Sequence, residues 1–296
     1  MNATFEGYLK LARPANLPTA AADIIAGAAI AGLFGNLSFA ETIWPEFLAL
    51  VLSSVFLYAG GVVFNDFFDF RIDTLERPER PIPSGIVSLK AAALFGTVLM
   101  LLGIALAFYV DTVCGSIALI LTLVILTYDA FSKNSAFFGP LNMGLCRGLN
   151  LLLGMSLLVN FEYWAIAFTP LVYIGAITMI SQGEVHGNNT KNIVLAGVLY
   201  AMVILGIAGA TFIWDLQKVQ ALPFLLVFSF LIFKPLINAY KENSPENIKK
   251  AVKAGVISLI VMDACIAVAF SHWWVGLLIL LLLPLAMALS RIFAVT

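Results

Sequence analysis

Long apolar segments, separated by short polar stretches, make up most of the chain. A helix that crosses a bilayer needs about 20 predominantly apolar residues, and ten segments of the chain meet that condition. They cover residues 16–34, 46–66, 89–109, 112–131, 138–158, 162–181, 192–212, 220–239, 251–270 and 273–292. This pattern predicts an all-α fold, a polytopic bundle of membrane helices.

The polar stretches predict one domain and a fixed orientation. None of them is long enough for a separate soluble domain, so we expect a single transmembrane domain over residues 1–296. If the ten segments cross in turn, 14 of the 16 Lys and Arg residues lie on one side. Because loops rich in Lys and Arg remain cytoplasmic, we expect that side and both termini to face the cytoplasm. The expected location is the cell inner (plasma) membrane, as a multi-pass protein.

The composition supports a membrane protein and excludes other classes. Of the 296 residues, 61% are hydrophobic and 11% are charged, which is far more apolar than an average soluble domain. The formal net charge is −1, whereas nucleic-acid binding requires a clustered basic surface. We therefore expect the lipid bilayer, and no nucleic acid, as a partner.

A strongly charged stretch comes after the second apolar segment, and we call residues 65–85 the first polar loop. Within it, Asp66, Asp69 and Asp73 are spaced i, i+3 and i+7. On a helix these positions lie within roughly 60° of one another, so three carboxylates share one face and repel each other. A hard cation that prefers oxygen ligands, such as Mg²⁺, would remove that repulsion. The spacing therefore predicts a Mg²⁺ site.

Two arginines later in the first polar loop extend this prediction. Arg77 and Arg80 carry planar guanidinium groups, which bind phosphate oxygens bidentately. Carboxylates and arginines together predict a site for a diphosphate that is bound through metal. The simpler alternative is a charged loop beside the membrane, in which Asp and Arg side chains pair with each other. Such pairing does not require the i, i+3, i+7 spacing of the carboxylates.

Two more polar loops are predicted on the same cytoplasmic side. The second polar loop spans residues 127–134, and the third spans residues 181–191. Polar chemistry is thus expected at one end of the bundle. A weak similarity between the loops after the second and sixth segments suggests two facing halves around a cavity.

At these loops the chain resembles the UbiA superfamily of intramembrane prenyltransferases. Asn65-Asp66-Phe67-Phe68-Asp69-Phe70-Arg71-Ile72-Asp73 matches the family's Asn-Asp-x-x-Asp-x-x-x-Asp motif, and Arg77-Pro78-Glu79-Arg80-Pro81 is similar to the segment after that motif in many members. Further similarities lie at Leu11–Asn16, Tyr128–Lys133 and Gly139–Asn142. The resemblance implies a nine-helix core, which residues 273–292 extend by a tenth, C-terminal transmembrane helix.

The resemblance also implies an enzyme, a prenyltransferase that moves the prenyl group of an isoprenoid diphosphate to an unidentified acceptor, with Mg²⁺ as cofactor. The implied metal-binding residues are Asp66, Asp69, Asp73 and Glu184. The implied diphosphate-binding residues are Asn65, Arg77, Arg80, Lys133, Asn188 and Lys191. The implied catalytic residues are Asp66, Asp69, Tyr128, Lys133 and Glu184.

The third polar loop departs from the family pattern. Where the family has Asp-x-x-Asp-x-x-x-Asp, this chain has Ser181, Glu184 and Asn188. One carboxylate remains of three, so we expect a second Mg²⁺ to bind more weakly or not at all. The run Gly183-Glu184-Val185-His186-Gly187 is similar to the UbiA-like subgroup called EboC. His186 is either a proton acceptor for the incoming nucleophile or a hydrogen-bond partner of the loop backbone.

Charged residues, among them Asp23, Arg147 and Asp263, also lie within the apolar segments. A charge at the bilayer centre costs about 2.5–3.5 kcal/mol on insertion scales, so Arg147 requires a partner. Asp129, Asp23 or the bound diphosphate are the candidates. Asp263, in the ninth segment, is expected to make a helix-packing contact.

Two functions of different classes are consistent with these observations. The first is Mg²⁺-dependent prenyl transfer. The alternative is a catalytically weakened UbiA-like protein that binds or moves an isoprenoid lipid, because the third polar loop has lost carboxylates. A phosphatidyl-type transferase is disfavoured because its Asp-Gly-x-x-Ala-Arg opening is absent. A secondary transporter is disfavoured because the polar residues cluster at one membrane face and not at the midplane.

Overall fold

The computed structural model describes residues 3–35, 42–135, 137–184 and 187–293, and the regular elements in these ranges are helices. The α-helices are α1 (Ala3–Ala12), α2 (Leu17–Ala31), α4 (Trp44–Phe68), α5 (Phe70–Glu76), α6 (Leu89–Val110), α7 (Thr112–Thr127), α8 (Phe138–Met155), α9 (Phe168–Ser181), α10 (Thr190–Ile213), α11 (Lys218–Lys241), α12 (Pro245–Phe270), α13 (Trp273–Leu280) and α14 (Leu282–Ile292). Shorter helical turns are η1 (Pro14–Asn16), η2 (Leu33–Gly35), the π-helical η3 (Tyr128–Ser132), η4 (Ser156–Leu158) and η5 (Trp164–Ala167).

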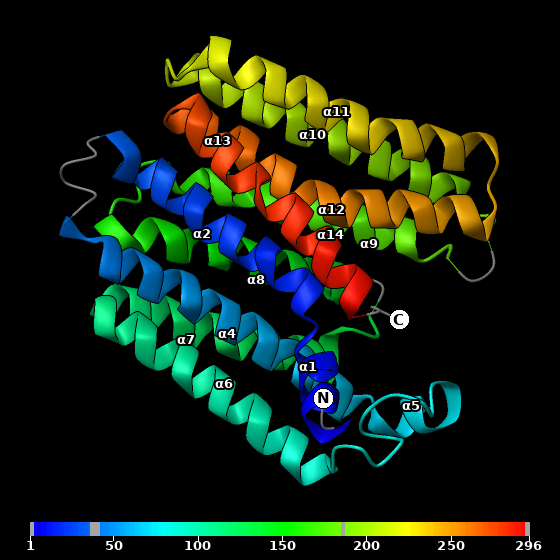
Figure 1. Ribbon diagram of the computed structural model, residues 1–296. Coiled ribbons are helices and arrows are strands. Elements are labelled where there is room, and N and C mark those ends of the chain that lie inside the picture. Colours follow the sequence, from blue (N-terminus) through cyan, green and yellow to red (C-terminus); the bar gives the residue numbers. More distant parts are fainter. Residues whose placement is uncertain (1–2, 36–41, 136, 185–186, 294–296) are drawn as a thin grey trace.

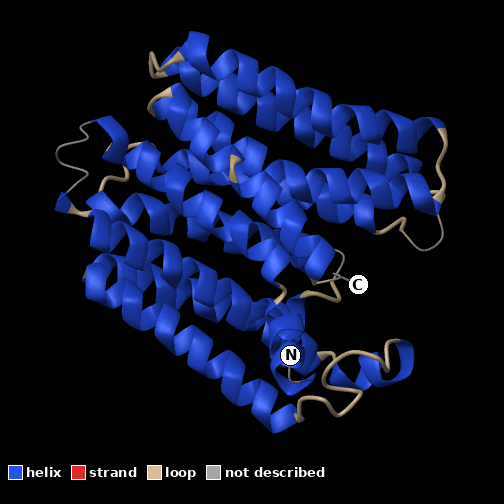
Figure 2. Ribbon diagram, in the orientation of Figure 1, coloured by secondary structure: helices blue, strands red, loops and turns tan. Residues whose placement is uncertain are grey.

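The predicted polytopic helical bundle is confirmed. Nine helical segments in the described ranges are long and apolar enough to cross a membrane, and they lie side by side over most of their length (Figure 2). These nine correspond to the second to tenth of the predicted segments, with ends that differ by a few residues. The first predicted segment, residues 16–34, forms a helix of 15 residues, which is shorter than these nine.

Helix α2, which forms that first segment, is the buried centre of the bundle. It has 15 residues, all but the first of which are buried, and it packs against α4, α8, α12 and α14. At 1.5 Å per residue it is about 22 Å long, which is shorter than the about 30 Å hydrocarbon core of a bilayer. The turns η1 and η2 extend it at both ends. The bundle is therefore built around a short helix that neighbouring helices shield.

Two glycines allow α2 and α8 to approach each other closely. A Cβ atom on Gly27 would lie 2.3 Å from the carbonyl oxygen of Leu151, and one on Gly154 would lie 2.6 Å from the carbonyl oxygen of Ile24. Both distances are too short for any larger side chain. Small residues at a crossing let helix backbones pack directly in a membrane, where apolar burial gives little driving force.

Two groups of helices flank α2 and α8. On one side α4, α6 and α7 pack together, and on the other α9, α10, α11 and α12 pack together. Figure 1 shows these groups on either side of α2 and α8. α2 and α8 lie between the two groups, and the predicted cavity between two facing halves stays a prediction.

The predicted C-terminal membrane helix is present as α13 and α14, which are separated at Leu281. Pro284 has no N–H group, so the carbonyl of Leu280 loses its helical hydrogen bond there. Beyond this break, α14 packs against η1 and α2. It ends at the same end of the bundle as α1 (Figure 1).

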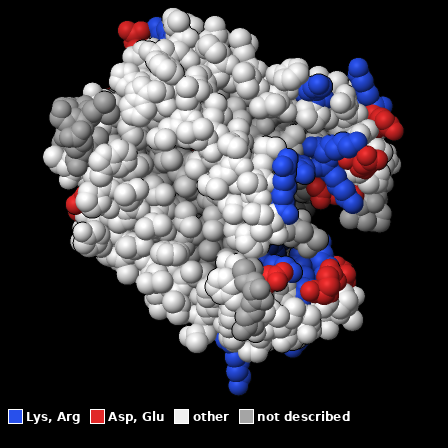
Figure 3. Space-filling view, in the orientation of Figure 1, with Lys and Arg blue, Asp and Glu red and all other residues white. Residues whose placement is uncertain are grey.

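Charged side chains gather at that same end. In Figure 3 the acidic and basic residues form two groups there, separated by a recess, while most of the remaining visible surface is uncharged. The prediction that polar chemistry lies at one end of the bundle is therefore confirmed.

Candidate active site

The first polar loop continues the helical path of α4. The N–H of Asp69 donates to Asn65 O at 3.0 Å, and the N–H of Asp73 donates to Asp69 O at 2.8 Å. These i to i−4 bonds carry the helix through Asp69 into α5. The three aspartates therefore keep the helical spacing that places their carboxylates on one face, as the sequence predicted. Asp66 and Asp73 are buried, and Asp69 is partly exposed.

Arg80 joins two of these carboxylates. Its Nη1 atom lies 2.7 Å from Asp73 Oδ2 and 3.3 Å from Asp66 Oδ1. Helix α5 ends at Glu76, and the turns after it bring Arg80 back over the cluster. Arg77 lies in the same turns, yet its side chain is exposed. The structure thus brings one of the two predicted arginines to the carboxylates and leaves the other in solvent.

Two further cations reach the cluster from distant segments. Arg13, which precedes η1, pairs with Asp66. Lys133, which comes directly after η3, lies with its Nζ atom 2.5 Å from Asp69 Oδ1. Each of the three aspartates of the motif is therefore paired with at least one cation. Two of these cations come from other segments, so the ion pairs join separate parts of the fold. The simpler alternative described pairing within one loop only.

The second polar loop enters the site through a π-helical turn. In η3 the backbone ladder widens, and the N–H of Lys133 donates to Tyr128 O at 3.1 Å. Such turns are frequent at functional sites. Asp129 in this turn is buried, and its Oδ1 atom accepts a hydrogen bond of 3.0 Å from Asn65 Nδ2. The phenol of Tyr128 lies within electrostatic range of Asp69 and Asp129.

The third polar loop has different partners. Burial raises the pKa of Glu184 above its usual value, and the nearby Lys249 of α12 partly opposes that rise. The N–H of Asn188 lies 3.5 Å from Asn243 O, and the side chains of Asn188 and Lys191 are exposed. In the described part of the chain, no hydrogen bond or ion pair joins Glu184, Asn188 or Lys191 to the first polar loop. Val185 and His186 lie outside the described residues, so the two roles considered for His186 stay predictions.

Sequence reasoning missed two residues of the site, Arg13 and Asp129. Arg13 has a φ of 46°, a left-handed conformation that few residues other than glycine adopt. Arg13 comes directly before Pro14, just ahead of the first predicted segment. A charged residue at that junction was the sequence signal that could have identified it as part of the site. Asp129 was considered only as a partner of Arg147. Its position in the second polar loop, between Tyr128 and Lys133, was the signal for a place in the site.

The donor set suits a hard metal ion, although cations hold the carboxylates here. Among the described residues, no group of three or more His, Cys, Asp or Glu side chains is placed to hold a metal. However, Asp66 and Asp73 converge on one atom, Arg80 Nη1, so both carboxylates face a common point. Carboxylate oxygens are the ligands that Mg²⁺ prefers. Metal binding at these residues therefore requires Arg80 to exchange partners.

A second charged cluster lies deeper, in the bundle core. The Nη2 atom of Arg147 lies 3.0 Å from Asp23 Oδ1 and 3.9 Å from Asp263 Oδ2, and all three residues are buried. Asn150 also donates to Asp23, at 2.8 Å. Of the three candidates for the partner of Arg147, Asp23 is confirmed. Asp263 joins α12 to this cluster, in agreement with its predicted packing role.

Comparison with known proteins gives a consistent family. The model of the UbiA prenyltransferase family matches residues 25–183, which is more than half of the chain. A digeranylgeranylglyceryl phosphate synthase of Methanosarcina barkeri is 40% identical over 162 residues, which cover 53% of this chain and 56% of that protein. The chain thus matches little more than half the length of this relative.

Two solved structures share the fold. One, described in connection with digeranylgeranylglyceryl phosphate synthase, is 23% identical, has a TM-score of 0.69, and covers 90% of this chain and 98% of its own. The other is a UbiA homologue from Archaeoglobus fulgidus bound to GPP and Mg²⁺. It is 16% identical, has a TM-score of 0.65, and covers 88% of this chain and 99% of its own.

Proposed function

The chain belongs to the UbiA prenyltransferase family, and from that premise we propose that it transfers the prenyl group of an isoprenoid diphosphate to an acceptor in the membrane. The observation that carries the proposal is the meeting of Asp66, Asp69 and Asp73 with Arg13, Arg80 and Lys133, which come from three separate segments. A metal-bound diphosphate needs carboxylates for the metal and cations for the phosphate oxygens within a few ångströms.

The residues of the site divide this work. Asp66, Asp69 and Asp73 are the groups that would hold Mg²⁺, which, when bound, supplies positive charge beside the leaving diphosphate. Arg80 and Lys133 then exchange carboxylate oxygens for phosphate oxygens, to which they donate charge-assisted hydrogen bonds. Asn65 holds the second polar loop against α4 through Asp129. We assign the hydroxyl of Tyr128, which lies within electrostatic range of Asp69, as a donor to a diphosphate oxygen.

In the proposed reaction the bond between C1 of the prenyl group and the diphosphate oxygen breaks, and its electron pair leaves with the diphosphate. A new bond joins C1 to the acceptor oxygen, whose proton passes to the departing diphosphate. The developing charge on the diphosphate is stabilised by the charged donors Arg80 and Lys133, and such electrostatic stabilisation is usually the largest single contribution to catalysis. Apolar surroundings exclude water, which would otherwise capture the prenyl cation.

For the acceptor we assign a hydroxyl group of a glyceryl phosphate. The support is the name of the relatives, digeranylgeranylglyceryl phosphate synthase. The first matched relatives are 40% and 34% identical over 53% and 62% of the chain. GPP, which accompanies Mg²⁺ in one structural neighbour, has the diphosphate headgroup that we assign to the donor.

We assign the third polar loop a supporting role. Glu184 is the remaining candidate for a second metal site, and Lys249 is its electrostatic partner. Arg77, Asn188 and Lys191 are exposed, so they would meet the diphosphate from the solvent side. All of them lie on the side of the bundle that we expect to be cytoplasmic, in the inner (plasma) membrane.

Turnover by the purified chain tests the proposal. The full chain in nanodiscs is incubated with radiolabelled geranylgeranyl diphosphate, Mg²⁺ and a glyceryl phosphate that carries one geranylgeranyl ether chain. We expect Mg²⁺-dependent release of diphosphate together with a lipid that carries two chains. Binding of the labelled lipid without release of diphosphate, at any Mg²⁺ concentration, would replace this proposal with the binding or transport function.

A further inference from the structure

Arg147 of α8 binds the first turn of α2. Its Nη1 atom donates to the hydroxyl of Thr19 at 3.2 Å, and its Nη2 atom donates to the backbone carbonyl of Thr19, also at 3.2 Å. The same Nη2 atom lies 3.0 Å from Asp23 Oδ1, one turn further along α2. The start of α2 is therefore held to α8 by a charged group that is itself buried.

A second side chain of α8 reinforces this attachment. Asn150 donates to Ala20 O at 3.1 Å and to Asp23 Oδ2 at 2.8 Å. Ser54 of α4 donates to Ala20 O at 3.1 Å and to Asn150 Oδ1 at 2.7 Å. A buried polar group that loses its partner is costly, so these bonds restrict how far α2 can slide or rotate against α8 and α4.

One hydroxyl connects the attachment to the turn that follows Arg13. Thr19 Oγ1 donates to Asn16 O at 2.8 Å, and the N–H of Asn16 donates to Arg13 O at 3.0 Å. The hydroxyl of Thr19 thus accepts from Arg147 and donates to η1. Hydrogen bonds in such a series polarise and strengthen one another.

The turn requires support because the backbone of Arg13 is strained. Arg13 has φ 46° and ψ 64°, a left-handed conformation, which persists in a residue with a side chain only when the surrounding structure holds it. Pro14 and Pro18 have no N–H groups, so fewer backbone donors are available to fix this turn. In this conformation Arg13 pairs with Asp66. The place of its guanidinium therefore depends on how firmly η1 is held.

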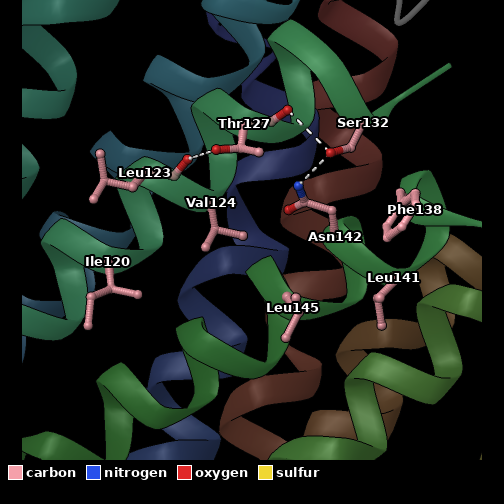
Figure 4. A pocket seen from close by; sticks show the side chains of 9 residues that line it. All are labelled: Ile120, Leu123, Val124, Thr127, Ser132, Phe138, Leu141, Asn142 and Leu145. Carbon is pink, nitrogen blue, oxygen red and sulfur yellow. Dashed lines mark hydrogen bonds between the residues drawn. The ribbon is translucent and has the colours of Figure 1, made fainter. Parts of the chain in front are cut away.

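Helix α8 also holds the turn that carries another cation of the site. A hydrogen bond of 3.0 Å joins Asn142 of α8 to Ser132, the last residue of η3 (Figure 4). The next residue, Lys133, pairs with Asp69. Helix α8 is thus a common support for two turns that are far apart in the sequence, and each turn adjoins a cation that faces the aspartates.

We propose that Arg147 is a positioning residue for prenyl transfer, which holds Arg13 at the diphosphate site through Thr19 and η1. The inference rests on the proposed function, in which the cations of the site bind the diphosphate. Arg147 acts from behind the first turn of α2 and touches neither substrate. Its ion pair with Asp23 keeps the guanidinium where it can donate to Thr19, so the deeper charged cluster serves the site as well as helix packing.

Thr19→Val breaks this series of hydrogen bonds with little change of shape. Valine replaces the hydroxyl with a methyl group and removes both of its hydrogen bonds. Thr122→Val is the matched control, because Thr19 and Thr122 are each 6% exposed. The hydroxyl of Thr122 also donates to a backbone carbonyl of the preceding turn, Ala118 O, at 2.8 Å, a bond that stays within α7.

Calorimetry in nanodiscs measures how the full chain binds geranylgeranyl thiolodiphosphate, a non-reactive donor, in the presence of Mg²⁺. We expect Thr19→Val to raise the Kd by about tenfold, which is a typical effect of losing a hydrogen bond to a charged group. Arg147→Lys keeps the charge but loses the planar fork, and it should raise the Kd by a similar factor. Thr122→Val should stay within about twofold of the unmodified chain.

A double-mutant cycle shows whether Thr19 acts through Arg13. In an Arg13→Gln background, Thr19→Val should change the Kd by less than about twofold, because the group that it positions is absent. In a Lys133→Gln background the tenfold effect should persist. An unchanged Kd in Thr19→Val, an equal rise with and without Arg13, or a rise larger than that of Arg13→Gln would overturn the inference.

Turnover of the same proteins separates the inference from the proposed function. If the unmodified chain binds the donor and shows the expected coupling, yet releases no diphosphate with any acceptor, the proposed function fails and the positioning role of Arg147 stands. If the unmodified chain turns over and Thr19→Val binds the donor as tightly as it does, the inference fails alone.

Discussion

The first and third polar loops lie at the same end of the bundle, yet their carboxylates are held in different ways. In the first, Asp66 and Asp73 are buried and share Arg80, while Asp69 pairs with Lys133. In the third, Glu184 is the single carboxylate at the motif positions, and its charged neighbour is Lys249 of α12. The first and third polar loops therefore differ in their charged groups and in the cations that lie near them.

The difference assigns the diphosphate chemistry to the first half. A carboxylate that is buried among cations from other segments is held in a fixed place, which a metal-bound diphosphate requires. Glu184 is half-buried and has one lysine nearby, so its carboxylate is held in place less firmly than those of the first polar loop. The comparison therefore predicts large effects for changes in the first polar loop and small ones for changes in the third.

The largest effect is expected at Asp66. Asp66→Asn removes a negative charge that faces Arg13 and Arg80, and with it a candidate metal ligand. We expect prenyl transfer to fall by about a thousandfold, since loss of one preorganised charged group in such a site costs on the order of 10²–10³. Initial rates at saturating donor measure it. Asp215→Asn, at an exposed site beside Lys218, is the control and should keep full activity.

Arg80 and Arg77 sharpen the comparison within the first polar loop. Arg80→Gln should lower the rate by about a hundredfold, because Arg80 bridges two carboxylates and is the cation best placed for the diphosphate. Arg77→Gln should lower it by about threefold at most, because an exposed cation contributes little through water. Equal losses in the two variants would show that the loop rearranges when substrate binds.

The third polar loop should be less sensitive. We expect Glu184→Gln to lower the rate by about tenfold or less, with the loss recovered at high Mg²⁺, because it weakens a second metal site that has already lost two carboxylates. Rates across a Mg²⁺ titration measure this. A loss as deep as that of Asp66→Asn would erase the contrast between the two halves.

The smallest expected effect is a pH dependence of stability at Glu184. Burial raises the pKa of this group in the folded chain, so folding favours its protonated form. The stability that it contributes is full below its unfolded pKa and is lost as pH rises through the folded value. Glu184→Gln should therefore raise the melting temperature slightly at neutral pH and leave it unchanged in acid. A gain of equal size at both pH values would contradict the assigned shift.

Much of the fold can be predicted from the sequence, because apolar runs of about 20 residues have few alternatives to spanning helices. The i, i+3, i+7 aspartates likewise predicted a helical acidic face, since neighbouring positions on one helix fix their geometry. The burial of α2 was not predicted. A run such as Ala20–Ala31 has the same hydropathy whether lipid or protein surrounds it, so only packing distinguishes the two.

The remaining site contacts depend on the tertiary fold. Arg13 and Asp66 are 53 positions apart, Asn65 and Asp129 are 64 apart, and no local pattern joins them. Likewise, the turns after Glu76 decide that Arg80 faces the carboxylates while Arg77 does not. The sequence predicted which chemical groups are present near the site, and the packing of α1, α4 and η3 decided which of them meet.

The most direct test of the central claim is a binding measurement on the first polar loop. Calorimetry in nanodiscs measures binding of a non-reactive donor, geranylgeranyl thiolodiphosphate, with and without Mg²⁺, for the unmodified chain, Asp66→Asn and Asp69→Asn. The account predicts tight binding that requires Mg²⁺ in the unmodified chain and is lost in both variants. Tight binding without Mg²⁺, or binding unchanged in the two variants, would contradict it.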